Sequence, residues 1–365
     1  VPADPLFQSP TYRVGLCKMG PLRWGICSAG KISQDFCHAI CDLENHTIQA
    51  IAARCEEDAQ KLGGKVGAET TYEGYNSLAT DPNVDIVYIG SVNTAHFALC
   101  RLFLEAKKHV LCEKPLGLHA KEVGQMIDLA RQGGVFFMEG IWSRFFPAYD
   151  KVRSLLSNGE IGDVKFITGD FCYDGFSIGS SHDKSLGEGA VYDIGVYLVQ
   201  LATMVFGPNP ILVQGVGGLT QTGVDEICSI TLKYPNHKIA SMVTCIAANS
   251  NNVASIVGTK GRINLLDSFQ ALSKLELVRG FPVPGMFEKE VFEFPHPHSD
   301  RPFNYPGSVG FQYQAQAVKK AIDEGKTEHP LMPWSESLAI HKIMDKLRHD
   351  VGYYRPDEET ENKIL

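Results

Sequence analysis

Three polar residues in two distant segments have the side chains needed to move a proton beside a reacting carbon. Lys114 follows the apolar run Val110–Cys112 and precedes Pro115. The run predicts a buried strand, so Lys114 is expected just past its carboxyl end, where open parallel α/β sheets bind ligands. Pro115 stiffens the turn and allows a cis peptide at small cost. The alternative is a plain strand, turn and helix start.

Asp193 and Tyr197 supply the other two polar groups. They are four residues apart in a predicted helix and therefore share one face. Gly195 between them costs about 1 kcal/mol of helix stability, which indicates that another group approaches the backbone there. A phenol near Lys114 is expected to have a lowered pKa. It can then take a proton from a substrate hydroxyl while Asp193 orients that hydroxyl; the alternative is a buried acid–phenol hydrogen bond.

A segment rich in aromatic residues follows the predicted strand Val135–Met138. Trp142 lies where side chains at the end of a sheet strand form the wall of an apolar pocket. Arg144, two residues on, can hold a phosphate or cross an interface. We assign both residues to the substrate pocket, and the alternative is that this segment forms an interdomain core.

The first predicted turn has the features of a dinucleotide-binding turn. It joins the predicted strand Arg23–Cys27 to the predicted helix Ile32–Ile40. Ser28 replaces the first glycine of the G-x-G-x-x-G pattern, Gly30 fills the second place and Ser33 the third. The N-terminus of the helix offers N–H groups and its dipole to phosphates. The residues assigned to the cofactor here are Ser28, Ala29, Gly30, Lys31 and Ile32.

An arginine ends the second predicted strand, Thr47–Ala53. Sites for NAD usually have Asp or Glu at this place to hold the ribose 2′-hydroxyl. The guanidinium of Arg54 suits a 2′-phosphate, which favours NADP over NAD. The alternative is a solvated surface arginine.

Strands alternate with helices up to about residue 145, which predicts βαβ units in a parallel sheet. Later strand-like runs join directly, which predicts an open, mostly antiparallel sheet in an α+β domain. The predicted domains are a flexible leader (1–22), a Rossmann domain (23–145) and a substrate-binding and dimerisation domain (146–365). The proline-rich stretch 281–308 shows no period and is predicted to be a long loop.

Composition limits the classes of partner. The formal net charge of −8 argues against a general nucleic-acid binder, and no apolar run reaches the ~20 residues of a membrane span. The ten cysteines include no C-x2-C pair, which suits a reducing compartment. Cys37, His38 and Cys41 are close in sequence, but on a helix they are expected to pack rather than bind metal. We expect a cytoplasmic protein without a metal centre.

These features together resemble the glucose–fructose oxidoreductase, inositol dehydrogenase and MocA family. The resemblance runs from about Arg23 to the last helix. The segments that carry it are Trp24-Gly25-Ile26, Asn93-Thr94-Ala95-His96, Val110 to Pro115, Gly258-Thr259-Lys260-Gly261 and Asp193-Ile194-Gly195-Val196-Tyr197. Many members have histidine where this chain has Tyr197. Tyrosine there, with Glu-x-Ile-Trp-x-Arg-Phe-Phe-Pro around Trp142, resembles the subfamily of dimeric dihydrodiol dehydrogenases.

The resemblance implies an activity and a site. The subfamily oxidises trans-dihydrodiols of benzene and naphthalene to catechols, and D-xylose at C1, with NADP. It implies that Lys114 and Tyr197 carry catalysis with the help of Asp193, and that Trp142 and Phe171 line the pocket. It also implies a homodimer built through the open sheet. The predicted cofactor set is completed by Ser91, His96, Glu113 and Lys114.

Two other functions stay open at this stage. One is an NADPH-dependent reductase of sugar ketones or dicarbonyls, which runs the same chemistry backwards. The other is a non-catalytic sensor that binds NADP(H) and reports the redox state. A sensor has no need for Lys114 and Tyr197 together, so the preferred function is a dehydrogenase that acts on a small diol or sugar.

Overall fold

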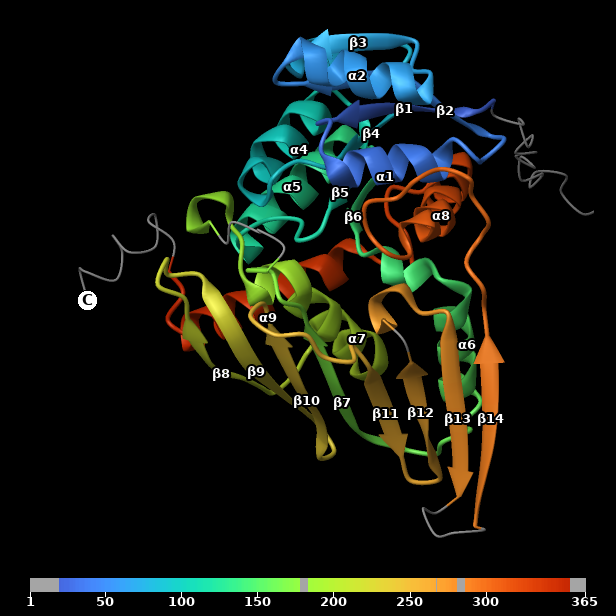
Figure 1. Ribbon diagram of the computed structural model, residues 1–365, viewed down its shortest axis with the longest axis vertical. Coiled ribbons are helices and arrows are strands. Elements are labelled where there is room, and N and C mark those ends of the chain that lie inside the picture. The colour runs from blue at the N-terminus through green and yellow to red at the C-terminus, as the bar shows by residue number, and fades with distance from the viewer. Residues whose placement is uncertain (1–19, 178–182, 267, 281–285, 355–365) are drawn as a thin grey trace, which may run out of the picture.

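The computed structural model describes residues 20–177, 183–266, 268–280 and 286–354. Its N-terminal domain contains a six-stranded parallel sheet of order β3-β2-β1-β4-β5-β6 (Figure 1). The strands are β1 (Leu22–Cys27), β2 (His46–Ala53), β3 (Thr70–Glu73), β4 (Ile86–Ile89), β5 (His109–Glu113) and β6 (Phe137–Gly140). This is the predicted Rossmann-type sheet. The short strand β3 was not predicted, because its residues are only partly buried.

Helices cover both faces of this sheet, as expected for parallel strands that read as continuous apolar runs. They are α1 (Lys31–Ile40), α2 (Glu56–Val66), α3 (Asn76–Thr80), α4 (His96–Glu105) and α5 (Ala120–Gly133), with the 3-10 turn η1 (Asn93–Ala95) before α4. One core packs around Trp24 of β1 and Phe36 of α1, and the other around Phe103 of α4 and Met126 of α5.

The C-terminal domain contains an eight-stranded sheet of order β14-β13-β12-β11-β7-β10-β9-β8. Its strands are β7 (Val164–Cys172), β8 (Leu212–Leu219), β9 (Asp225–Tyr234), β10 (Lys238–Cys245), β11 (Ala254–Gly258), β12 (Gly261–Leu266), β13 (Lys274–Gly280) and β14 (Phe287–Glu293). Only the β7–β10 pair is parallel in this sheet, so the prediction of a mostly antiparallel sheet is confirmed.

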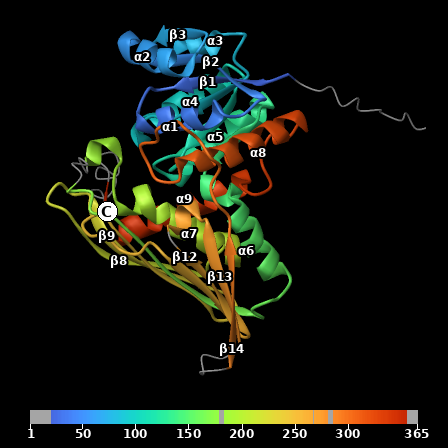
Figure 2. The ribbon, with the colours of Figure 1, turned by 45° about the vertical axis from the view of Figure 1, so that its right-hand side comes forward.

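Helices pack on one side of the second sheet (Figure 2). The domain's helices are α6 (Pro147–Ser157), α7 (Val196–Phe206), α8 (Phe311–Asp323) and α9 (Trp334–Asp350), and the turn η2 (Trp142–Phe145) enters the domain. Helix α7 packs against β7 and β10, and α9 against β8 and β9. The opposite side of the sheet exposes apolar side chains, including Phe166 (43% exposed), Ile239 (40%) and Val216 (65%).

The predicted loop over 281–308 is wrong in part. Residues 287–293 form β14, which pairs with the unpredicted strand β13 in an antiparallel ladder. Each residue of the segment Phe287-Glu288-Lys289-Glu290-Val291 is exposed. An edge strand that is charged and solvated lacks the inside-outside alternation from which strands are recognised. Residues 281–285 lie outside the described residues.

The chain returns to the N-terminal domain after β14. Both carboxylate oxygens of Asp35 in α1 accept backbone N–H bonds from this returning segment, from Asn304 at 2.8 Å and from Tyr305 at 3.0 Å. Phe311 of α8 meets Phe36 edge-on, with ring centroids 5.7 Å apart. Figure 1 shows α8 beside α1. The two domains are therefore joined by packing as well as by the connecting chain.

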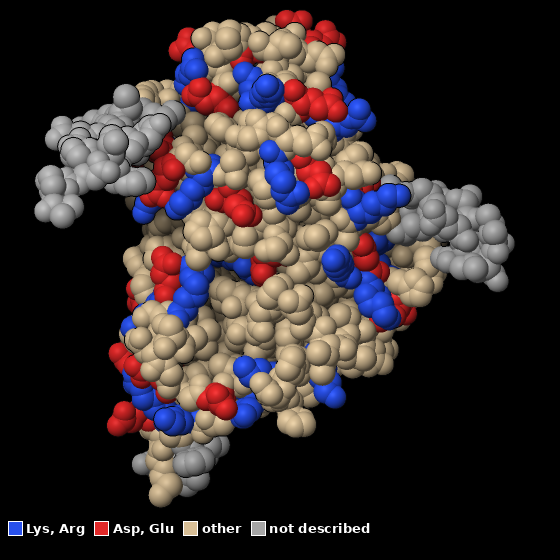
Figure 3. Space-filling view, turned by 180° about the vertical axis from the view of Figure 1, so that it is seen from behind, with Lys and Arg blue, Asp and Glu red and all other residues tan. Residues whose placement is uncertain are grey.

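Basic and acidic side chains are interspersed on the face of the molecule shown in Figure 3. Among the described residues, charged side chains pair locally, as in Arg101–Glu105 at 2.7 Å and Lys319–Asp323 at 2.8 Å. Among the described residues, no helix combines the length and the apolar character that crossing a bilayer requires.

Candidate active site

The structure brings Lys114, Asp193 and Tyr197 together between the two domains. Lys114 follows β5, and its peptide bond to Pro115 is cis. Its ammonium donates a hydrogen bond to the main-chain oxygen of Asp193 at 2.6 Å. The same nitrogen lies 5.3 Å from the centre of the Tyr197 ring. Lys114 precedes Asp193 by 79 positions and Tyr197 by 83 positions in the chain. The fold thus brings a cation, an acid and a phenol into one cluster.

Tyr197 lies in the first turn of α7 and is buried. Its hydroxyl oxygen accepts a hydrogen bond from the indole N–H of Trp142 at 2.7 Å. Phe171 of β7 packs against the Tyr197 ring at 5.6 Å between centroids. The predicted pocket residues Trp142 and Phe171 therefore both contact the phenol, and its O–H remains available to donate to a substrate oxygen.

The predicted lowering of the Tyr197 pKa is wrong for this arrangement. Burial raises the pKa of the phenol, and the nearby Glu113 carboxylate raises it further, while the Trp142 bond opposes them. The Lys114 ammonium donates to the Asp193 carbonyl and lies 5.3 Å from the centre of the Tyr197 ring. Tyr197 consequently keeps its proton at neutral pH.

Asp193 lies in a π-helical turn, η4 (Val191–Gly195), so the predicted α-helical geometry is wrong here. The hydroxyl of Thr244 donates to the main-chain oxygen of Ala190 at 3.1 Å and competes for a carbonyl at the start of the helix. Widened turns of this kind are frequent at functional sites. They place a side chain where a regular α-helix does not.

The carboxylate of Asp193 is held but still titratable near neutral pH. It accepts a hydrogen bond from the backbone N–H of Gly189 at 3.1 Å. Burial raises its pKa to about 6, although the charge of Lys114 and the Gly189 bond oppose that rise. A group with this pKa is ionised at pH 7 and can exchange protons close to that pH.

Asn93 was missed as a site residue, although its segment was noted for the resemblance. It projects from η1, and its amide donates to the main-chain oxygen of Gly187 at 2.9 Å. It also lowers the pKa of the Asp193 carboxyl, against the larger effect of burial. Asn93 thus connects the N-terminal domain to the acid of the cluster.

Glu113 and His96, predicted to contact the cofactor, are both buried beneath the site. The carboxylate of Glu113 accepts the hydroxyl proton of Tyr88 at 2.8 Å, and burial raises its pKa to about 7. The ring nitrogens of His96 lie 2.9 Å from the oxygen of Pro115 and 3.2 Å from that of Ser91. Burial lowers the His96 pKa to about 4, so the ring is neutral and its single N–H donates to one of these two carbonyl oxygens.

The assignment of Arg144 to the substrate pocket is wrong. Its guanidinium is buried and pairs with the carboxylate of Glu336 in α9 at 2.5 Å. It also donates to Gln200 and Thr203 of α7 and to the main-chain oxygen of Leu331. Because this donor set is used inside the fold, Arg144 joins elements of the core instead of holding substrate. These partners all belong to the C-terminal domain, so the contact lies within that domain and not between the two domains.

The first turn fits the pyrophosphate of a dinucleotide. Ser28 adopts a φ of 87°, which is rare for a residue other than glycine and matches the sharp bend required there. Gly30 precedes α1 without any side-chain cap, so the first N–H groups of the helix are open to an anion. Ser33 replaces the third glycine because Gly90 provides the space: a Cβ on Gly90 would lie 2.4 Å from the Ser33 hydroxyl.

Arg54 lies where it was predicted, directly after β2, and its side chain is exposed. It approaches Tyr75, whose pKa it lowers against the larger effect of burial. The chain thus presents a guanidinium at the adenosine end of the turn. A phosphorylated ribose fits this position by charge.

The Cys37, His38 and Cys41 group packs as predicted. Cys37 is buried in the core, Cys41 donates to the oxygen of Val66 at 3.7 Å, and a ring nitrogen of His38 contacts the oxygen of Pro302 at 2.6 Å. Within the described ranges, no three His, Cys, Asp or Glu side chains converge on a point suited to a metal ion.

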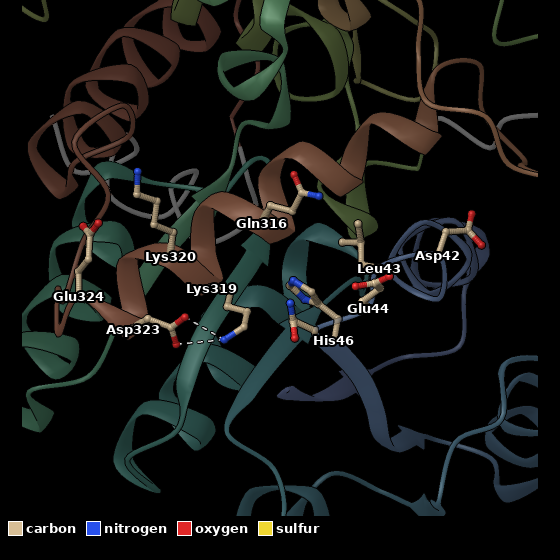
Figure 4. Close-up of a pocket in the computed structure, with 10 residues that line it drawn as sticks. Asp42, Leu43, Glu44, His46, Gln316, Lys319, Lys320, Asp323 and Glu324 are labelled. Carbon is tan, nitrogen blue, oxygen red and sulfur yellow. Dashed lines mark hydrogen bonds and ion pairs between the residues drawn. The ribbon is translucent and has the colours of Figure 1, made fainter. Parts of the chain in front are cut away.

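A separate hollow of about 640 Å³ lies between α8 and the loop before β2 (Figure 4). Figure 4 shows Lys319 directed toward Asp323, with which it pairs, and His46 on the opposite wall. His46 accepts the indole proton of Trp24 at 2.9 Å. The residues that line the hollow include none of the predicted site residues.

Fold and site define a class of protein: a dinucleotide-binding domain followed by an α+β domain that completes an oxidoreductase-like site. Comparison with family models agrees with this class. Residues 22–141 match the oxidoreductase family with an NAD-binding Rossmann fold, and residues 149–264 match the GFO/IDH/MocA C-terminal domain. The chain belongs to the Gfo/Idh/MocA oxidoreductase family.

Curated relatives extend the match over most of the chain. A protein of Danio rerio named trans-1,2-dihydrobenzene-1,2-diol dehydrogenase is 40% identical over 334 residues, which cover 91% of this chain and 97% of the relative. A relative of the same name from Homo sapiens is 36% identical and covers 92% of this chain.

Solved structures share the fold at lower identity. A 3-ketoreductase from Actinomadura kijaniata, solved with TDP-benzene and NADP, has a TM-score of 0.76 at 24% identity and covers 90% of this chain and 97% of its own. Levoglucosan dehydrogenase, solved with NADH and levoglucosan, has a TM-score of 0.80 at 19% identity and covers 91% and 97%. At these identities the likeness establishes the fold alone.

Proposed function

We propose that the chain is an NADP-dependent dehydrogenase that oxidises trans-dihydrodiols to catechols and cyclic aldoses such as D-xylose at C1. The observation that carries this proposal is the convergence of Lys114, Asp193 and Tyr197 beside an aromatic wall of Trp142 and Phe171. A polar end beside an aromatic wall suits a small ring that bears vicinal hydroxyls. The name shared by the curated relatives supports the same substrate class.

The residues divide the chemistry as follows. The nicotinamide, when bound, supplies the position that accepts the hydride. Tyr197 receives the proton of the reacting hydroxyl, and Trp142 stabilises the phenolate oxygen by donating to it. Lys114 lowers the energy of the developing negative charge on the substrate oxygen. The main-chain oxygen of Asp193 accepts the hydrogen bond of the Lys114 ammonium, and the Asp193 carboxylate orients the second hydroxyl of the substrate.

The raised pKa of Tyr197 supports a second candidate, reduction of a sugar ketone or dicarbonyl. A phenol that keeps its proton is ready to donate it to a carbonyl oxygen, whereas the oxidative direction first requires its ionisation. The same residues serve both directions by microscopic reversibility.

NADP is proposed over NAD because of the charge at the adenosine end. Arg54 follows β2, where an acidic residue is expected in an NAD site. Open N–H groups at the start of α1 and the bend at Ser28 suit the pyrophosphate.

A homodimer through the open face of the second sheet is also proposed. That face exposes Phe166, Ile239, Val243, Ile227 and Val216 on four neighbouring strands. Contiguous exposed apolar side chains of this extent are typical of interaction sites. The free thiols of every cysteine in the described part of the chain suit the cytoplasm.

A substrate panel tests the function. Initial rates with NADP and NAD are measured for a trans-dihydrodiol, D-xylose and other aldoses, and in reverse for sugar ketones and dicarbonyls with NADPH. Turnover of diols or aldoses with NADP supports the dehydrogenase. Tight NADPH binding without turnover of any compound contradicts it and favours a redox sensor.

A further inference from the structure

Five of the six residues after Lys114 have a main-chain group bound by a side chain, and the sixth, His119, accepts the backbone N–H of Val123 in α5. The donors and acceptors come from β6, from the start of α4 and α5, from η4 and, most often, from α9. The contacts run from Pro115 to Ala120 and are made by His96, Glu139, His341, Glu122, Tyr192, Arg348 and Asp345. A turn held in this way has its backbone position set by distant parts of the chain.

Glu139, at the end of β6, accepts the first main-chain N–H after the lysine, since Pro115 has none. It is fully buried, and one carboxylate oxygen accepts the N–H of Leu116 at 3.0 Å. Leu116 is also buried, so this N–H has no access to water. The function proposed above gives Glu139 no role, yet a buried carboxylate persists only where its contacts compensate for desolvation.

Helix α9 supplies three contacts from one face. His341, Asp345 and Arg348 have the spacing i, i+4 and i+7, which aligns side chains along a helix. His341 accepts the N–H of Gly117 at 3.3 Å, Asp345 accepts that of Ala120 at 2.9 Å, and Arg348 donates to the oxygen of Leu118 at 3.1 Å. At each of these three contacts, the α9 side chain supplies the donor or the acceptor that the main-chain group of the turn requires.

The tautomer of His341 is consistent with this role. Its Nδ1 lies 2.8 Å from the main-chain oxygen of Ser337 and therefore carries the proton, which leaves Nε2 as the acceptor for Gly117. The same Nε2 lies 3.8 Å from the Glu139 carboxylate. Glu139 and His341 thus hold successive N–H groups, at Leu116 and Gly117, from two different domains.

We propose that Glu139 and the α9 residues His341 and Asp345 are positioning residues, which fix the turn 115–120 and thereby place the ammonium of Lys114. None of them needs to touch substrate. A lysine side chain is long and flexible, so the placement of its nitrogen depends on a rigid backbone at its base. The proposal rests on the catalytic role of Lys114 given above.

Matched variants separate the hydrogen bond from the packing. Glu139→Gln keeps an oxygen for the Leu116 N–H, whereas Glu139→Leu has a similar size and removes it. His341→Gln and His341→Leu form the same kind of pair at Gly117. Each variant is compared for kcat, KM for NADP, thermal midpoint and hydrogen exchange at the amides of Leu116 and Gly117.

The proposal predicts that the Leu variant at each position loses activity and that the Gln variant largely keeps it. The Leu variants lose at least tenfold in kcat with KM for NADP within twofold of wild type, and exchange at Leu116 or Gly117 accelerates. The Gln variants retain at least a third of kcat. In a Lys114→Met background, Glu139→Leu produces no further loss of the residual rate, because it acts through the lysine.

Several results overturn the proposal. Equal losses in the Gln and Leu variants, a further loss in the Lys114→Met background, or failure of both Leu variants to fold would show that these residues act only on the structure. Faster exchange without any change in kcat would show that the turn is held but does not position the lysine. Absence of turnover in wild type, with the exchange result intact, identifies failure of the proposed function instead.

Discussion

The half of the site assigned to the cofactor is built mainly from backbone, whereas the half assigned to substrate is built from buried side chains. The first depends on the bend at Ser28, on the uncapped N–H groups of α1 and on space left by Gly90. The second depends on Lys114, Asp193 and Tyr197, of which the acid and the phenol have pKa values raised by burial. Backbone geometry is a local property, whereas burial is a property of the whole fold.

The comparison predicts that changes in the two halves have separate effects. Substitutions in the half assigned to the cofactor should alter cofactor affinity or stability and leave the chemical step unchanged. Substitutions in the half built from side chains should alter the chemical step by large factors and leave the cofactor bound.

After Tyr197→Phe, the largest effect is expected for Lys114→Met. Removal of one charged group that stabilises developing negative charge costs roughly 10²–10³ in kcat. The measurement is steady-state kinetics with the best substrate of the panel. Lys121→Met, at an exposed position of α5, is the matched control and should retain full activity. Wild-type turnover in Lys114→Met would end the catalytic role of the lysine.

Arg54→Ala should affect the cofactor half alone. Loss of a charge-assisted contact to a 2′-phosphate is expected to raise the KM for NADP about 10- to 100-fold, with less than a twofold change for NAD. Lys61→Ala, an exposed residue of α2, serves as the control. Equal changes for the two cofactors would contradict the 2′-phosphate contact.

The pH dependence of oxidation should report the buried side chains. Because the pKa of Asp193 is raised to about 6, its carboxylate forms as the pH rises through 6, and kcat/KM should increase roughly tenfold between pH 5 and 7. The rate should continue to rise on the alkaline side, since the raised pKa of Tyr197 delays formation of the phenolate. Asp193→Asn should remove the increase near pH 6. An unchanged profile in that variant would assign the increase to another group.

The smallest effect is expected at Ser28. Its φ of 87° favours glycine, so Ser28→Gly should raise the unfolding free energy by up to about 1 kcal/mol and change the KM for NADP by less than threefold. Ala29→Gly, at a position without positive φ, should instead be neutral or destabilising. Chemical denaturation of the two variants measures the difference. Destabilisation by Ser28→Gly would mean that its hydroxyl matters more than its backbone.

The sequence predicts the backbone-built half well because its signals are local. The strand, small-residue turn and helix around Gly30, and Arg54 after β2, lie where they were expected. The positions of Lys114, Asp193 and Tyr197 were also expected, yet the shift of the Tyr197 pKa was predicted in the wrong direction. Its causes are burial within the fold and the carboxylate of Glu113, 84 positions away in the sequence, which composition and periodicity do not reveal.

The errors at Arg144 and at the turn of Asp193 also involve contacts between residues far apart in the sequence. Arg144 is buried against Glu336 of the last helix, a partner 192 residues away that no local pattern identifies. At the π-helical turn of Asp193, Thr244 from a strand of the second sheet donates to the oxygen of Ala190, a contact 54 positions apart in the sequence. Strand β14 was missed because its exposed, charged residues lack a buried face.

The central claim is that Tyr197 exchanges a proton with substrate and contributes little to cofactor binding. Single-turnover kinetics of Tyr197→Phe, with NADPH affinity measured on the same sample, tests it most directly. The account predicts a loss of about 10²–10⁴ in the rate of the chemical step and an NADPH Kd within twofold of wild type. A near-wild-type rate, or a loss of NADPH binding that matches the loss of rate, would contradict it.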